Sequence, residues 1–145
     1  MKLNVKRALA LLQRDLKKNW SKLDFEYEIK EDKISVASTL TLNNVEGSIR
    51  AIISVYSGGG TICRAVLDKI DATEDTLNAI NRFNDDNVFF KAFIREDGYL
   101  ELSSFFVAYE IGMLKFYASE FLSRLADLAD DEIIQGLAKL TYTDD

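Results

Sequence analysis

The side chains most often used for catalysis and metal binding are sparse in this sequence. The chain of 145 residues contains no histidine and one cysteine, Cys63. Histidine is the commonest general base and the usual zinc ligand, so its absence excludes most hydrolase and metalloenzyme designs. A cysteine nucleophile needs a neighbour that favours the thiolate, and without histidine the nearest candidate is Arg64. We therefore predict that Cys63 is a small core residue in a strand.

The glycine-rich run Gly58-Gly59-Gly60-Thr61 has a composition that could bind phosphate through backbone N–H groups. A P-loop consists of a glycine, four further residues and then Gly-Lys-Ser/Thr, and it lies between a strand and a helix. Here no lysine follows, and the next residues have the alternation of a strand. The three glycines instead predict a hairpin turn, since glycine adopts positive φ at little steric cost.

Two acidic clusters, Asp85-Asp86 and residues 130–132, could offer oxygen ligands to a hard cation. Neither has the alternating acids, central glycine and final glutamate of a calcium loop. Acidic residues also favour the amino terminus of a helix, so we interpret the clusters as signals that end and begin helices. We expect no metal, no cofactor and no catalytic residue, and we predict that the chain is not an enzyme.

Charge is distributed unevenly along the chain. Residues 1–22 carry seven basic residues and one acidic residue, a net charge of +6, whereas residues 23–145 carry −12. This asymmetry can mark a nucleic-acid or membrane contact, but attraction between the basic segment and the acidic body explains it as well. The basic segment has Trp20 as its single aromatic residue, so we expect no nucleic-acid partner.

Hydropathy indicates neither a targeting segment nor a membrane span. The most apolar region, residues 105–122, is interrupted by Glu110, Lys115 and Glu120, and a span requires roughly 18 uninterrupted apolar residues. A lone cysteine also fits a reducing compartment. We expect a cytoplasmic protein without a membrane partner.

The elements that must position these residues follow from hydrophobic periodicity. Apolar residues at helical spacing predict a first helix over residues 4–20, with Asn4 as its cap. Alternation with a period of two predicts antiparallel strands over residues 23–29, 34–42, 49–55 and 61–67. The first pair of strands is joined by a turn at Glu31-Asp32.

The second half of the chain alternates between helix and strand signals. Thr73 predicts the start of a helix over residues 73–84, and residues 88–95 are apolar on both sides, as in a strand covered by helices. Asp97-Gly98 predicts a hairpin into residues 99–106. Helical spacing returns over residues 111–128, a short helix follows the second acidic cluster, and residues 141–145 should fray.

These elements predict a single domain, residues 1–145, of the α+β class. The sheet is expected to be twisted and antiparallel, with an N-terminal helix, a helix inserted between strands, and one or more C-terminal helices.

Part of this pattern is a recognisable motif. Asn81 and Asn84 form an Asn-x-x-Asn helix end, Lys91 begins a Lys-Ala strand, and Asp97-Gly98 is an acidic-Gly turn before another strand and a long helix. In motif and in element order, over roughly residues 3–129, the chain resembles the bacterial YbjN-like domain family.

The YbjN-like family itself resembles the type III secretion chaperone fold. The resemblance implies a binding or chaperone-like module and transfers no catalytic residue. Within the motif, the amides of Asn81 and Asn84 either bind a partner or satisfy backbone groups at the end of the helix.

Large aromatic residues are concentrated between residues 89 and 121, where ten occur. Two helix stripes and one sheet face need fewer, so we predict that the surplus forms an exposed apolar patch suited to a partner helix or a second subunit. An ordinary aromatic core is the alternative. The candidate partner-binding residues are Phe89, Phe93, Phe105, Phe106, Tyr109 and Phe116.

The sequence thus favours a non-enzymatic protein-binding module, chaperone-like or regulatory. Its partner is an unidentified protein or a second copy of the chain in a homodimer. The alternative is a regulator that binds a small molecule or nucleotide between the sheet and a helix.

Overall fold

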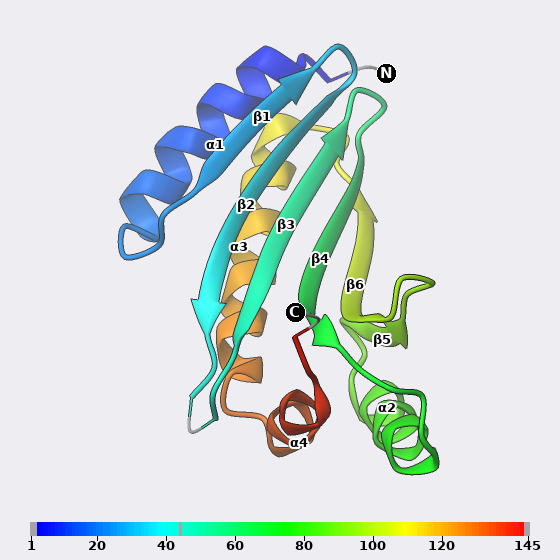
Figure 1. Cartoon of the computed structure of the whole chain (residues 1–145). Coiled ribbons are helices and arrows are strands. Elements are labelled where there is room, and N and C mark those ends of the chain that lie inside the picture. Colours follow the sequence, from blue (N-terminus) through cyan, green and yellow to red (C-terminus); the bar gives the residue numbers. More distant parts are fainter. Residues whose placement is uncertain (1–2, 44, 144–145) are drawn as a thin grey trace.

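The fold is described from a computed structural model, which describes residues 3–43 and 45–143. It belongs to the α+β class, as predicted, and is built on one six-stranded antiparallel sheet (Figure 1). The elements are, in chain order, α1 (Val5–Asn19), β1 (Glu26–Lys30), β2 (Lys33–Thr41), β3 (Ser48–Tyr56), β4 (Gly60–Lys69), α2 (Glu74–Asp86), β5 (Lys91–Ile94), β6 (Tyr99–Val107), α3 (Ile111–Leu128) and α4 (Glu132–Leu140).

The sheet has the strand order β1-β2-β3-β4-β6-β5. The first four strands form a meander, and the turn between β1 and β2 contains only Glu31 and Asp32, because Lys30 pairs with Lys33. After β4 the chain forms α2 and β5 before β6 returns to pair with β4. Both β1 and β5 are therefore edge strands.

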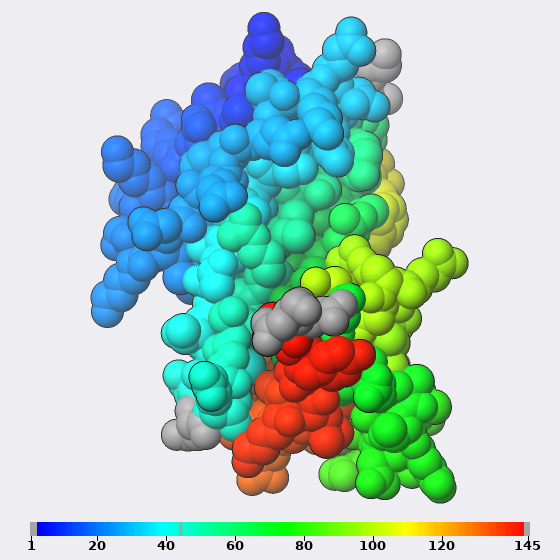
Figure 2. Space-filling view, in the orientation of Figure 1, coloured from blue at the N-terminus to red at the C-terminus, as the bar shows by residue number. Residues whose placement is uncertain are grey.

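Helices α1 and α3 cover one face of the sheet, which α3 crosses from behind in Figure 1. Alternation along β2 and β3 turns Ile34, Val36 and Ile53 into this helical layer, where Leu16 and Leu114 are also fully buried. The other face is turned toward the reader in Figure 2, and its surface consists of the strands' own side chains, with α2 and α4 near the lower end.

The basic helix α1 is held to the body mainly by apolar packing. It begins after Asn4, whose side chain accepts a 3.1 Å hydrogen bond from the Arg7 N–H as predicted, and it buries Leu12 and Leu16 against α3 and β2. Within residues 3–43 and 45–143, the lysines and arginines of α1 form no ion pair. The ion pair between the two helices instead joins Asp15 of α1 to Lys115 of α3 at 3.5 Å.

The glycine run forms the predicted turn between β3 and β4. Gly59 has a φ of +91°, and its carbonyl accepts a 2.9 Å hydrogen bond from the N–H of Ala108. A side chain at this position would be strained in backbone conformation and would also lack space, because its Cβ would lie 2.5 Å from the Ala108 carbonyl oxygen.

The predicted fraying of the C-terminal tail is wrong for residues 141–143. The Tyr142 N–H donates to the Lys69 carbonyl at 2.8 Å, and the Thr143 hydroxyl donates to Asp68 Oδ2 at 3.0 Å. This segment therefore continues the sheet beside the end of β4. Residues 144–145 lie outside the described residues.

The strand predicted over residues 88–95 is too long, and helices cover only one of its faces. Asn87 Oδ1 accepts a 2.7 Å hydrogen bond from the Phe90 N–H, which holds residues 87–90 in a turn, so β5 begins at Lys91. Phe93 lies on the face opposite the helices and is 41% exposed. The edge strand is consequently less than half as long as β6.

Candidate functional site

Asn84 joins the end of α2 to the edge strand β5. Its Nδ2 donates to the Ala92 carbonyl at 3.0 Å, and its Oδ1 accepts from the Ala92 N–H at 2.7 Å. Lys91 Nζ donates to the carbonyls of Asn84 and Asn87 at 3.0 and 3.3 Å, which satisfies acceptors at the helix end. Of the two roles considered for Asn84, the structural one holds in part: its amide satisfies backbone groups, but these belong to Ala92 of β5 and not to the end of the helix.

The other motif residues lie on the surface near the same joint. Asn81 is exposed on α2. Asp97 accepts a 2.8 Å hydrogen bond from Arg95, and Gly98 has a φ of +90°, so both shape the hairpin between β5 and β6 as predicted. The motif residues thus connect β5 to α2 and form the hairpin between β5 and β6, and their side chains do not line one common cavity.

The predicted aromatic cluster is divided between core and surface. Phe90 and Phe121 are fully buried, with ring centroids 5.8 Å apart. Phe105 is 66% exposed, and Phe116 and Tyr109 are each 64% exposed. The remaining candidates, Phe89 and Phe106, are half-buried.

Several of these residues border a strand edge. β5 pairs with β6 only as far as Ser103, and on this side residues 104–107 have no strand partner within the described chain. The Arg95 N–H donates to the Tyr99 carbonyl, so odd-numbered residues of β6 direct their backbone groups toward β5. The backbone groups of Phe105 and Val107 therefore point outward. We call residues 104–107 the open β6 edge.

A cavity of about 410 Å³ lies beside the open β6 edge. Phe106 packs on Tyr117 with ring centroids 4.2 Å apart, and Tyr117 contacts Phe116 at 5.7 Å. On the other side, the Arg124 guanidinium lies 4.7 Å from the ring centroid of Phe89. The cavity is also lined by Lys91, Ser103 and Ser104. We define the aromatic surface as its five apolar and aromatic lining residues together with Phe116: Val88, Phe89, Phe105, Phe106, Tyr117 and Phe116.

The aromatic surface overlaps the predicted site only in part. It includes four of the six candidates, whereas Phe93 and Tyr109 do not line the cavity. Val88, which is 95% exposed, and Tyr117 were missed. The signal for Val88 is Asn87, because an asparagine directly after a helix can hold the following residues in a turn rather than a strand.

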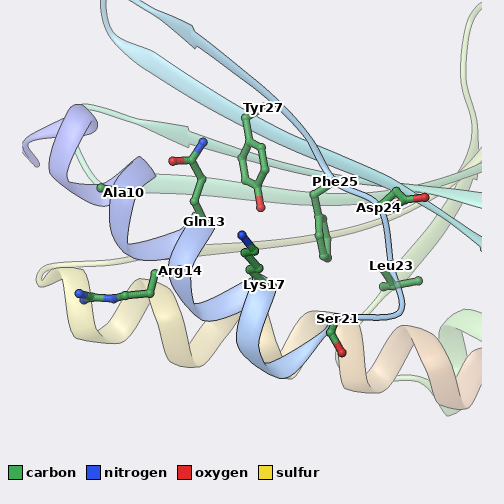
Figure 3. A pocket seen from close by; sticks show the side chains of 9 residues that line it. All are labelled: Ala10, Gln13, Arg14, Lys17, Ser21, Leu23, Asp24, Phe25 and Tyr27. Atoms are coloured by element: carbon green, nitrogen blue, oxygen red, sulfur yellow. The ribbon is translucent and has the colours of Figure 1, made fainter.

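A second groove, of about 870 Å³, separates α1 from β1 and the segment before it (Figure 3). Gln13 and Lys17 point from the helix toward the rings of Phe25 and Tyr27, whereas Arg14 points away from them. The two rings have centroids 6.3 Å apart, and burial raises the pKa of Tyr27. Sequence reasoning assigned none of these residues to a site, although it considered a ligand between sheet and helix.

Two further observations concern chemistry. Cys63 is fully buried, and burial raises the pKa of its thiol far above the ordinary value, which opposes formation of a nucleophilic thiolate. Among residues 3–43 and 45–143, no group of three histidine, cysteine, aspartate or glutamate side chains could hold a metal ion. The helices in the same residues are all too short or too polar to cross a membrane.

Comparison with known proteins gives no relative. The chain matches no family model, no curated protein and no solved structure. The resemblance to the YbjN-like family therefore stays a prediction from the motif and the element order.

Proposed function

We propose that this chain is a non-enzymatic protein-binding module, chaperone-like or regulatory, that acts in the cytoplasm. The observation that carries the proposal is the aromatic surface beside the open β6 edge. Aromatic residues are enriched at the centres of protein interfaces, where their rings provide large contact areas at a small entropic cost. The resemblance to the YbjN-like family supports the same function.

The exposed side chains are large enough to supply binding energy. Burying apolar surface stabilises a complex by about 25 cal/mol per Å², and a large aromatic side chain has roughly 150–250 Å² to bury. With Phe105 66% exposed and Phe116 64% exposed, these two residues alone can contribute several kcal/mol before the costs of association.

Site-specific photo-crosslinking tests this function. Benzoylphenylalanine is incorporated at position 105 in one variant and at position 77 in a control, because Leu77 is a 45% exposed apolar residue on α2, away from the aromatic surface. We expect protein adducts, with a second copy or another protein, from position 105 and few from position 77. If position 105 gives no protein adduct, or no more than position 77, the proposed function is wrong.

The groove between α1 and β1 favours a second candidate, a regulator that binds a small molecule or nucleotide. Lys17 could contact an anionic group, and Phe25 and Tyr27 could stack on a ring. Small-molecule sites usually enclose roughly 70–90% of their ligand, whereas Gln13, Arg14 and Lys17 are exposed, so we prefer the first function. A thermal-shift panel of nucleotides tests the second, since a ligand at 100 times its Kd adds about 2.7 kcal/mol.

A further inference from the structure

Two regions of the sheet that lack a strand neighbour, β1 and the open β6 edge, differ in charge. At β1, Lys30 and Lys33 close a two-residue turn, so Tyr27 and Ile29 direct their backbone groups outward. Three charged residues alternate with them, Glu26, Glu28 and Lys30. The open β6 edge carries only Ser104, Phe105, Phe106 and Val107, and Ser103 before it is also uncharged.

This difference has a physical meaning. Outward-facing N–H and C=O groups at an edge form hydrogen bonds with any strand that approaches, and native proteins block such pairing with charged residues, proline or bulges. The charges along β1 provide this protection. The open β6 edge has no charge and no proline, and it carries two phenylalanines. An accessible edge without charge or proline favours pairing with a specific strand.

We infer that this strand is β6 of a second copy, paired antiparallel across a two-fold axis. The inference rests on the proposed function and names its partner. A two-fold interface requires a patch complementary to itself, and antiparallel pairing of one segment with its own copy meets this requirement. Because the segment is uncharged, two copies meet there without direct repulsion between like charges, despite the net charge of −6 per chain.

The hydrogen-bonding pattern selects one register. Pairing centred on Phe105 would place Val107 opposite Ser103 of the other copy, but Ser103 already pairs with Lys91 of β5. Pairing centred on Phe106 places Phe105 of each copy opposite Val107 of the other. All the outward backbone groups of these two residues are then satisfied, and the two sheets join into one.

The same register brings the aromatic surfaces together. The two Phe106 side chains meet at the axis on the helical side, next to Tyr117 of each copy. The exposed parts of the six members of the aromatic surface amount to roughly 500 Å² per copy. With all of this surface covered, two copies would bury at most about 1,000 Å² of side chain, and the strand backbone would have to supply the rest of the roughly 1,200 Å² at which stable interfaces begin.

Sedimentation equilibrium on the full chain tests the inference. We expect a dimer for the wild type and a dissociation constant at least 100-fold higher for Val107→Pro, because the Val107 N–H points outward and its loss breaks no bond to β4. Ile29→Pro is the matched control, since it removes an outward N–H at the edge of β1, and it should remain dimeric. Circular dichroism establishes that both variants are folded.

Disulfide trapping tests the register without a proline. Residues that face each other in a non-hydrogen-bonded antiparallel pair have Cα atoms about 4.5 Å apart, within the range of a disulfide. Mild oxidation of Phe106→Cys should therefore give a covalent dimer. Phe105→Cys should not, because the same residue of the other copy is not opposite to it. Cys63 is buried and remains unreactive.

Three results would overturn the inference: a monomeric wild type, a dimer that Val107→Pro leaves intact, or a covalent dimer formed through position 105 rather than 106. These failures are distinct from failure of the proposed function. A monomer that still forms protein adducts from position 105 binds another protein, so the function stands and the second copy is excluded as its partner.

Discussion

Replacing Asn84 by alanine removes both hydrogen bonds that its side chain forms with the edge strand β5. The Ala92 N–H, on a residue only 4% exposed, loses its acceptor at 2.7 Å, and the Ala92 carbonyl loses its donor at 3.0 Å. A neutral hydrogen bond contributes about 0.5–1.5 kcal/mol, and a buried group left without a partner costs about 1–3 kcal/mol. We expect Asn84→Ala to lower the free energy of unfolding by about 2–4 kcal/mol.

Urea unfolding followed by circular dichroism measures this change, with Asn81→Ala as the matched control. Asn81 belongs to the same motif and the same helix, but it is exposed, so its replacement should change the free energy of unfolding by less than about 0.5 kcal/mol. Hydrogen exchange provides a local measurement, because the Ala92 amide should lose protection in Asn84→Ala and keep it in Asn81→Ala.

The reasoning is refuted if Asn84→Ala lowers stability by less than about 1 kcal/mol or if the two variants behave alike. Either result would mean that the attachment of β5 depends on Lys91 or on apolar packing rather than on the Asn84 amide. If Asn81→Ala were the more destabilising variant, Asn81 would have a structural role that its exposure does not suggest.

Three other changes have defined outcomes. Gly59→Ala should cost at least about 2 kcal/mol in urea unfolding, because it combines an unfavourable positive φ with a clash, whereas Gly58→Ala meets no atom within 4 Å and should be nearly neutral. Burial raises the pKa of Cys63 above its ordinary 9.0. The buried neutral thiol therefore makes its full contribution to the free energy of unfolding below about pH 9, and this contribution declines as the pH rises toward the pKa of the folded state. Between about pH 9 and 10.5 the wild type should therefore lose up to about 1.4 kcal/mol per pH unit relative to Cys63→Ala. Lys115→Ala should cost about 1 kcal/mol in the same assay, because the buried Asp15 carboxylate loses a cation that is itself half exposed to solvent.

A defined result would contradict each of these three predictions. Equal effects at Gly59 and Gly58 would mean that the turn relaxes without strain. Parallel pH curves for the wild type and Cys63→Ala would mean that the thiol is not buried in solution. An unchanged unfolding midpoint for Lys115→Ala would indicate that Asn19, which donates to Asp15 at 2.8 Å, is enough to stabilise the carboxylate.

The sequence predicts the fold well where one physical rule acts alone. Strands β2, β3 and β4 alternate along most of their length because one face meets the helices and the other does not. The caps Asn4 and Thr73 were identified from hydrogen-bonding capacity, and each accepts the expected bond from the third residue beyond it.

Prediction failed where two rules compete. Residues 88–95 have the apolar composition of a strand, but Asn87 captures the Phe90 N–H and shortens β5. That local bond exposes Val88 and opens the β6 edge, which composition alone cannot indicate. The groove between α1 and β1 was also missed, because it depends on the distance between a helix and a strand. Periodicity predicts only which residues of each element face inward.

The strand order has a consequence for the protein during its synthesis. β4 lies beside β6, but α2 and β5 are made between them, so a nascent chain can assemble the β1–β4 meander while the inner edge of β4 still has no neighbour. The helix α3, which covers the apolar side of that strand, emerges later still. A chain arrested within α2 would therefore expose an unprotected edge and an uncovered apolar face, a combination that favours aggregation. The interval between the translation of β4 and that of α3 is the period in which this chain itself most needs a molecular chaperone.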